Sequence, residues 1–232
     1  MSSAFLDHHS RLGDQFIMNG AVREYCKRYD RVGIFSIPRY YKEVSYMFRD
    51  LKNLHIEIAA TERSRQFFAL KNLLTRRYDR FVYARGEDFE TGILPELQFY
   101  KMAGVDHAKK WDNFFIEREP ARENALYERL VHKEPYIVLH DDARYPTDPS
   151  RITSPLPQVR PDKGLTDNVF DYRRILEQAQ EIHVIDSSFM FFVDLLKYEN
   201  PAQKLFVHRY ARPNPAFNLP ILRKPWEILD EL

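Results

Sequence analysis

The sequence predicts a mixed α/β protein made of two consecutive units, each with a parallel sheet. In the first half, short β-rich runs alternate with amphipathic helical segments, and a second such alternation begins near residue 136. The 232 residues, 44% of them hydrophobic, are enough to build more than one small core. Because parallel strands need crossover connections, this alternation favours sheets with helices on both faces.

The first half supplies four strand candidates. The run of β-branched and aromatic residues from Val32 to Ile37 is stopped by Pro38 and is typical of a buried strand. Phe16, Ile17 and Ala21 lie at helical spacing after the first strand. The expected strands are Ala4–Leu6, Arg31–Ile37, Leu54–Ala59 and Arg80–Tyr83. The expected helices between them are Asp14–Tyr29, Arg39–Leu51 and Glu62–Thr75.

The middle of the chain, residues 86–134, differs in character. Leu94–Ala103 and Ala121–Val131 have apolar residues at helical spacing and are expected to be helices. Between them lies an aromatic segment, Trp111–Phe115, which fits either an edge strand or a packed loop.

A second α/β unit begins at the buried-strand pattern of Tyr136–Leu139. Five prolines between Tyr145 and Lys163 predict an extended connection with little regular helix. Asp167 or Asn168 can cap the helix that follows. The remaining expected elements are a helix at Val169–Gln180, a strand at His183–Ile185, a helix at Phe189–Leu196 and a strand at Lys204–Val207. We therefore expect domains at residues 1–130 and 131–232.

Composition excludes several classes of function. The 35 Lys and Arg nearly balance the 34 Asp and Glu, so no overall field attracts nucleic acid, and no nucleic-acid partner is expected. No run of about 18 apolar residues and no signal-peptide pattern occurs, so we expect a cytoplasmic protein without an integral membrane segment. One cysteine, Cys26, allows neither a disulfide nor a cysteine-zinc site. The 7 glycines form no glycine-rich phosphate loop, so side chains and helix ends must hold any phosphate.

Polar residues follow the expected strands where each strand ends. His8, His9 and Asp14 follow the first strand, and the second half places polar residues after three strands, at 140–144, 186–188 and 208–212. Ligands of α/β proteins bind at this edge of a sheet. A cleft between two facing sheets would collect these side chains and would suit an anionic nucleotide ligand.

Several short motifs, in this order, resemble those of the heptosyltransferase-like (glycosyltransferase family 9-like) GT-B glycosyltransferases. Leu12-Gly13-Asp14 resembles the amino-terminal Gly-Asp corner, with Gly20 where that family usually has proline. In the second half, the similar segments are Tyr136–Arg144, Gly164–Ala179, Lys204–Arg212 and the donor turn Asp186-Ser187-Ser188-Phe189. Ser188 stands where the family has glycine, and Phe191 where it often has histidine.

The resemblance implies a compact GT-B fold, with two Rossmann-like domains whose parallel sheets face a central cleft. It implies inverting transfer of a sugar from a nucleotide-diphosphate sugar to a hydroxyl of a glycan acceptor, with no metal and no cofactor besides that co-substrate. Asp14 corresponds to the general base, which removes the proton of the acceptor hydroxyl. The first domain would bind the acceptor and the second the donor. The expected donor-binding residues are His140, Asp142, Arg144, Asp186, Ser187, Ser188, Phe189, His208, Arg209 and Arg212. Those expected on the acceptor side are His8, His9, Gly13 and Asn19.

Each candidate has a simpler interpretation that stays open. Asp14 fits a helix N-cap, Asp186 fits a turn-forming residue, and Arg209 with Arg212 fits a solvated surface pair. His140-Asp141-Asp142 could bind a divalent ion, although neighbouring residues on an extended segment point to opposite sides. His8 and His9 fit either an acid-base pair or a hydrogen-bonded wall.

Two other functions also stay open. A GT-B-type nucleotide-sugar epimerase or hydrolase would bind the same donor but would need an acid and a base beside the sugar. A non-catalytic module would bind a nucleotide sugar without turnover. The sequence does not specify the nucleotide, the sugar, the acceptor, the linkage or the oligomeric state.

Overall fold

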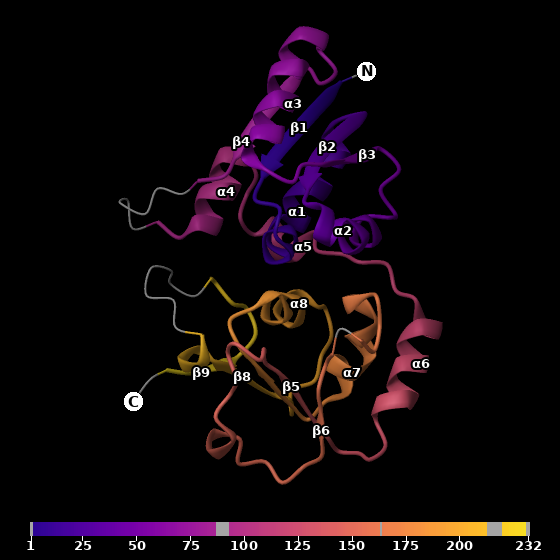
Figure 1. Cartoon of the computed structure of the whole chain (residues 1–232), viewed down its shortest axis with the longest axis vertical. Coiled ribbons are helices and arrows are strands. Elements are labelled where there is room, and N and C mark those ends of the chain that lie inside the picture. Colours follow the sequence, from indigo (N-terminus) through magenta and orange to yellow (C-terminus); the bar gives the residue numbers. More distant parts are fainter. Residues whose placement is uncertain (1, 87–92, 163, 213–219, 231–232) are drawn as a thin grey trace. The chain divides into compact units, whose positions relative to one another are not determined.

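The computed structural model describes residues 2–86, 93–162, 164–212 and 220–230. The chain divides into two compact units, residues 1–117 and 118–232, so that helix α6 (Pro120–Leu130) belongs to the second unit. Each unit contains one sheet whose strands are all parallel (Figure 1). The mixed α/β fold with two parallel sheets is therefore confirmed. No helix of the described residues is both long and apolar enough to cross a membrane.

The first unit contains a four-stranded sheet in the order β3-β2-β1-β4. Its strands are β1 (Ser3–His8), β2 (Arg31–Ser36), β3 (Leu54–Ile58) and β4 (Arg80–Ala84). Its helices are α1 (Leu12–Arg28), η1 (Pro38–Tyr40), α2 (Tyr41–Met47), α3 (Glu62–Thr75), α4 (Pro95–Ala103) and α5 (Lys109–Asp112). All four strands expected in this half of the chain are present.

Strand β1 lies inside this sheet, between β2 and β4, and every residue from Ser3 to His8 is buried. Phe5 packs edge-on against Phe35 at a centroid distance of 4.5 Å and stacks on Phe81 at 5.0 Å. Gly33 of β2 leaves room for this cluster, because a Cβ there would lie 2.4 Å from the Phe5 ring. This packing holds strand β1 in place within the sheet, and the first candidate site begins at the carboxyl end of that strand.

The second unit contains a five-stranded sheet in the order β6-β5-β7-β8-β9. Its strands are β5 (Ile137–His140), β6 (Gln158–Val159), β7 (Glu181–Val184), β8 (Lys204–His208) and β9 (Trp226–Leu229). Its helices are α6, η3 (Pro149–Arg151), η4 (Val169–Tyr172), α7 (Arg173–Gln178), α8 (Ser188–Leu195) and η5 (Arg209–Ala211). The sequence patterns predicted β5, β7 and β8 but not the two edge strands.

The two missed strands are held by contacts that no local pattern reveals. Strand β6 is two residues long and lies within the proline-rich connection. Strand β9 follows a segment anchored on buried Asp194, whose Oδ1 accepts hydrogen bonds from the N–H of Arg223 at 2.9 Å, the N–H of Lys224 at 3.0 Å and the indole N–H of Trp226 at 3.1 Å.

Three expected segments differ in detail. Trp111–Phe115 is no strand: it holds the end of α5 and a loop, whose Phe115 carbonyl accepts hydrogen bonds from Asn19 and Arg23 of α1. The single helix expected at Val169–Gln180 is split into η4 and α7, and the Asn168 side chain caps η4 by accepting the Phe170 N–H at 3.1 Å. Helix α1 begins at Leu12, so Gly13 lies inside the helix and not in a turn before it.

Candidate functional site

The carboxyl end of β1 is built on a buried ion-pair network. Asp7 is 1% exposed and pairs with Arg65 of α3 at 2.8 Å and with Arg85, just after β4, at 2.9 Å. Burial raises the pKa of Asp7, and the two guanidinium groups oppose that rise. Arg65 also donates to the His8 carbonyl at 3.0 Å and to the Ser10 hydroxyl. One arginine thus fixes the path of the chain between β1 and α1.

His8, expected on the acceptor side, is fully buried. Its Nδ1 lies 2.6 Å from the His9 carbonyl, which requires a proton on Nδ1. Its Nε2 has no hydrogen-bond partner among the residues described. Burial lowers the pKa of His8 to about 3, so the ring is neutral at physiological pH. As placed, His8 forms part of the wall beneath this corner.

Asp14 and His9 lie together at the start of α1. Asp14 occupies the third helical position, since the N-cap is Arg11, and its carboxylate accepts the Arg11 N–H at 3.1 Å. Burial raises the pKa of Asp14, and the nearby charge of His9 is the largest effect in the opposite direction. The His9 ring packs at 5.3 Å from the Phe99 ring. A half-buried carboxylate with a raised pKa is a stronger base than an exposed one.

The other two acceptor-side candidates lie along α1. Gly13 is half-buried in its first turn, next to Asp14. Asn19 is fully buried, and its amide bonds Phe115 and the Arg23 side chain. Asn19 therefore fixes the loop after α5 in this structure.

In the second unit, three of the expected donor residues meet at the ends of β5 and β7. The His140 ring stacks on the Phe189 ring at a centroid distance of 4.1 Å and an angle of 17°. The Ser187 hydroxyl lies 3.5 Å from His140 Nδ1. Ser187 is the N-cap of α8 and Ser188 its first residue, so the free N–H groups at this helix end lie beside the imidazole.

Asp186 and Arg212 are joined across the ends of β7 and β8. Arg212 donates to the Asp186 carbonyl, and its guanidinium lies 5.4 Å from the centre of the Tyr145 ring. Burial raises the pKa of the Asp186 carboxyl, whereas Arg212 and Arg209 lower it. Arg209 lies 3.8 Å from Asp230. These contacts hold a cationic group next to the first turn of α8.

The residues after His140 form a local loop. Asp142 accepts the Arg144 N–H at 2.9 Å, and the Arg144 side chain is 77% exposed. Asp141 instead bonds Thr147 and pairs with Arg160 at 3.1 Å. In the described part of the chain, no three His, Cys, Asp or Glu side chains are grouped so as to hold a metal ion.

His208, expected at the donor site, is fully buried in a hydrogen-bond chain. Its Nε2 lies 2.9 Å from His183 Nδ1, and its Nδ1 lies 2.9 Å from the Tyr210 hydroxyl. Tyr210 in turn accepts the Asp148 N–H at 2.9 Å. Burial lowers the pKa of His208 to about 4. Both ring nitrogens are used, so His208 supports the carboxyl ends of β7 and β8 from beneath.

Sequence reasoning missed the residues that support these two edges. Arg65 is the clearest case, because a charged residue in a helical pattern is ordinarily placed on the solvated face. The sequence did contain an indication that Arg65 faces inward, because Arg65 and Phe68 are three residues apart and so share the inner face of α3. Tyr145 was assigned only to the proline-rich connection, although it stacks on Arg212.

Each of the two units has a parallel sheet with helices and with polar side chains at the carboxyl ends of its strands, which is the layout of a Rossmann-like domain. Neither a scan against protein-family models nor a search of curated proteins finds a match for the sequence. Among solved structures, the chain resembles ADP-heptose lipopolysaccharide heptosyltransferase II of E. coli, with a TM-score of 0.53 and 11% identity over 98% of this chain and 90% of that one. It also resembles a family 9 glycosyltransferase of Veillonella parvula, with a TM-score of 0.59 and 8% identity over 100% of this chain and 88% of that one. The predicted resemblance to this family is thus confirmed in the fold of nearly the whole chain.

Proposed function

We propose that this protein is a glycosyltransferase that moves a sugar from a nucleotide-diphosphate sugar to a saccharide hydroxyl, with inversion at the anomeric carbon. The observation that carries the proposal is the half-buried Asp14 carboxylate at the carboxyl edge of β1, within a fold shared with glycosyltransferases. The first unit binds the acceptor, and the second binds the donor.

Asp14 acts as the general base. It takes the proton of the acceptor hydroxyl while that oxygen attacks the anomeric carbon, and the bond from this carbon to the diphosphate oxygen breaks on the opposite face. The nucleoside diphosphate leaves with the bonding electron pair. His9, whose charge acts on Asp14, tunes the basicity of the carboxylate.

Arg212 and the first turn of α8 stabilise the leaving diphosphate. Arg212 is oriented by the Asp186 carbonyl and by Tyr145, so its guanidinium loses little freedom on binding phosphate. The N–H groups of the first turn of α8 and the Ser187 hydroxyl add donors at the positive end of the helix. The rest of the proposed donor site, at the carboxyl ends of the strands of the second sheet, consists of Arg209, Arg144, Ser188, Phe189, His140 and Asp142. This arrangement needs no metal ion, and we propose none.

The test measures nucleotide binding and turnover separately. Purified protein is titrated calorimetrically with ADP, GDP, UDP and CDP, and turnover of the corresponding nucleotide sugars is followed with and without saccharide acceptors. We expect one diphosphate to bind, and Asp14→Asn to keep that binding while losing at least about 100-fold in turnover. Glu43→Gln is the matched control, since it removes an acidic side chain from the first turn of α2.

Three results would contradict the proposal. Turnover unchanged in Asp14→Asn would exclude this residue as the base. Interconversion of donor epimers without transfer would indicate an epimerase. Failure of all four diphosphates to bind would favour a module without this activity.

A further inference from the structure

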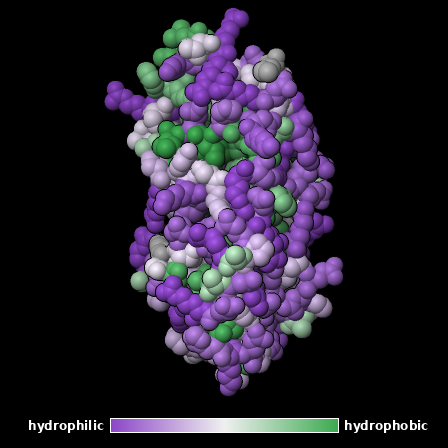
Figure 2. Space-filling model, turned by 90° about the vertical axis from the view of Figure 1, so that its right-hand side faces the viewer, coloured by the Kyte–Doolittle hydropathy of each residue, from purple (hydrophilic) through white to green (hydrophobic). Residues whose placement is uncertain are grey.

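Helix α3 exposes four large apolar side chains. Phe67, Leu70 and Leu74 are 68%, 56% and 81% exposed, and they share one face because they lie three, four and seven residues apart. Leu73, 74% exposed, flanks them. Figure 2 shows hydrophobic surface gathered over the first unit, with hydrophilic side chains around it.

The inner face of the same helix carries Phe68, which packs on the Phe5 ring at 4.8 Å, and two buried polar side chains. Arg65 and Asn72 are each 7% exposed; Arg65 pairs with Asp7, and Asn72 bonds the Tyr78 backbone at 2.8 and 3.2 Å. Packing against the sheet therefore does not account for the exposed leucines and Phe67 on the outer face. Large apolar side chains grouped on a surface mark an interaction site.

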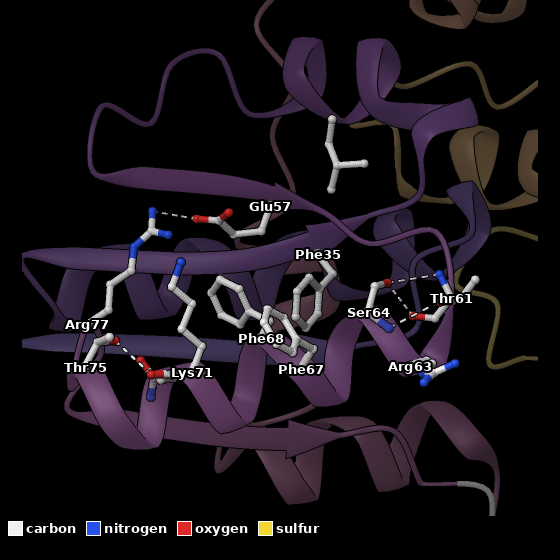
Figure 3. A pocket seen from close by; sticks show the side chains of 12 residues that line it. Phe35, Glu57, Thr61, Arg63, Ser64, Phe67, Phe68, Lys71, Thr75 and Arg77 are labelled. Carbon is white, nitrogen blue, oxygen red and sulfur yellow. Dashed lines mark hydrogen bonds and ion pairs between the residues drawn. The ribbon is translucent and has the colours of Figure 1, made fainter.

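A cavity of about 600 Å³ lies between α3 and β3, beside this face. Figure 3 shows the rings of Phe35, Phe67 and Phe68 gathered in its middle. Lys71 and Arg77 lie at one end, and Arg63 lies at the other. The cavity thus has an apolar centre with cationic groups at its ends.

The charge around this face is strongly unbalanced. From Glu62 to Arg80 the chain contains six basic residues and two acidic residues, Glu62 and Asp79, and Glu62 is paired with Arg85 at 2.5 Å. One of the six, Arg65, is neutralised internally by Asp7, and Arg77 pairs with Glu57 at 2.6 Å. Arg63, Lys71 and Arg76, on α3 or directly after it, remain exposed at the surface.

We propose that the outer face of α3 docks on an anionic lipid bilayer. A basic helix with exposed Phe and Leu side chains is the pattern of a helix that lies in the membrane interface. A second copy of the chain fits worse, because a two-fold contact through this face would place the same excess of positive charge against itself. Phe67, Leu70, Leu73 and Leu74 insert among the acyl chains, while the surrounding cations contact lipid phosphates.

The test is co-sedimentation with vesicles of phosphatidylcholine alone or mixed with phosphatidylglycerol. We expect binding to the mixed vesicles only, weakened by added salt. The double variant Phe67→Ser/Leu74→Ser is expected to lose at least about tenfold in partitioning. Arg63→Gln/Lys71→Gln is expected to lose roughly tenfold. Met102→Ser, at an apolar side chain of α4 that is 47% exposed, is the matched control.

Circular dichroism and thermal unfolding check that each variant is folded, and neither depends on lipid or on a nucleotide. Equal binding to both vesicle types, or equal binding by Phe67→Ser/Leu74→Ser and the parent protein, would overturn the proposal. A parent protein that ignores vesicles and forms a dimer abolished by Phe67→Ser/Leu74→Ser would assign this face to a second copy. The proposal stands apart from sugar transfer, because it predicts binding without any donor.

Discussion

Arg65 Nη1 lies 2.8 Å from Asp7 Oδ1, and the two side chains are 8% and 1% exposed. The pair connects helix α3 to the end of the central strand β1. It also determines where the next residues go, because Arg65 bonds the His8 carbonyl and the Ser10 hydroxyl. The corner that contains Asp14 is thus positioned by a residue 51 places away in the sequence.

Removing this guanidinium is expected to be costly. Arg65→Met leaves Asp7 buried with only Arg85 as an ionic partner, and breaking a buried pair costs about 3–5 kcal/mol. Denaturant unfolding monitored by circular dichroism measures the loss. Arg63→Met, on the exposed face of the same helix, is the control and is expected to change stability by less than about 0.5 kcal/mol. Equal stability of the two variants would contradict the role assigned to Arg65.

Asp14→Asn is expected to stabilise the protein while it lowers turnover at least about 100-fold. A raised carboxyl pKa means that the folded state binds the proton more tightly than the unfolded state. The stability that Asp14 contributes is therefore lost as pH rises from the unfolded pKa through the folded pKa. At pH 8 the melting temperature of Asp14→Asn should equal or exceed that of the parent, with the advantage shrinking toward pH 4. A lower melting temperature at pH 8 would show that the ionised carboxylate stabilises the fold.

Gly20→Ala is expected to disrupt the contact between α1 and α5. A Cβ at Gly20 would lie 1.8 Å from the carbonyl oxygen of Lys109, and backbone on both sides leaves no flexible side chain to move. We expect a loss of at least about 2 kcal/mol, typical of overpacking. Gly164→Ala, where the nearest atom is 3.8 Å away, is the control. Thermal unfolding of both variants tests this expectation. Equal melting temperatures would show that α1 and α5 can move apart without loss of stability.

His8 is expected to make the first unit acid-sensitive. Its pKa falls from an ordinary 6.5 to about 3 in the folded state, so the unfolded state binds the proton more tightly. Stability should be fully present above pH 6.5 and should fall as pH drops toward 3. His8→Leu cannot be protonated, so its unfolding free energy should fall less over that range. Parallel pH profiles for the two proteins would assign the acid sensitivity elsewhere.

Arg212→Gln is expected to weaken nucleoside diphosphate binding. Losing a charge-assisted contact of roughly 1.5–3 kcal/mol corresponds to about 10- to 100-fold in affinity. Calorimetric titration measures this, with Arg129→Gln of helix α6 as the control. Unchanged affinity in Arg212→Gln would show that the diphosphate does not bind at the first turn of α8.

Most of the fold could be predicted because its central elements follow local patterns. The buried runs at 32–35 and 137–139, within β2 and β5, show as continuous apolar segments, which are typical of parallel strands. Strand β9 could not be predicted this way, since it depends on Asp194, which lies 32 residues before Trp226. An edge strand of this kind reflects such distant contacts more than local preference.

The candidate site could be predicted only in part, for a related reason. The positions of the strand ends and the order of the motifs indicated Asp14, Asp186 and Ser187, which follow the carboxyl ends of strands. These sequence patterns could not distinguish an exposed polar residue from a buried one. His208 and Asn19 follow the same patterns but are fully buried and hydrogen-bonded.

The contiguous first sheet also bears on how the protein is made. Strands β1 to β4 all lie between residues 3 and 84, so every partner in that sheet is available before any strand of the second has been synthesised. The second sheet is different, because β8 gains its outer neighbour only when residues 226–229 have emerged. Domains generally fold as units during synthesis, the amino-terminal one first. A nascent chain stalled just after β8 would therefore present a folded first unit and an open strand edge, a target for chaperones or for aggregation.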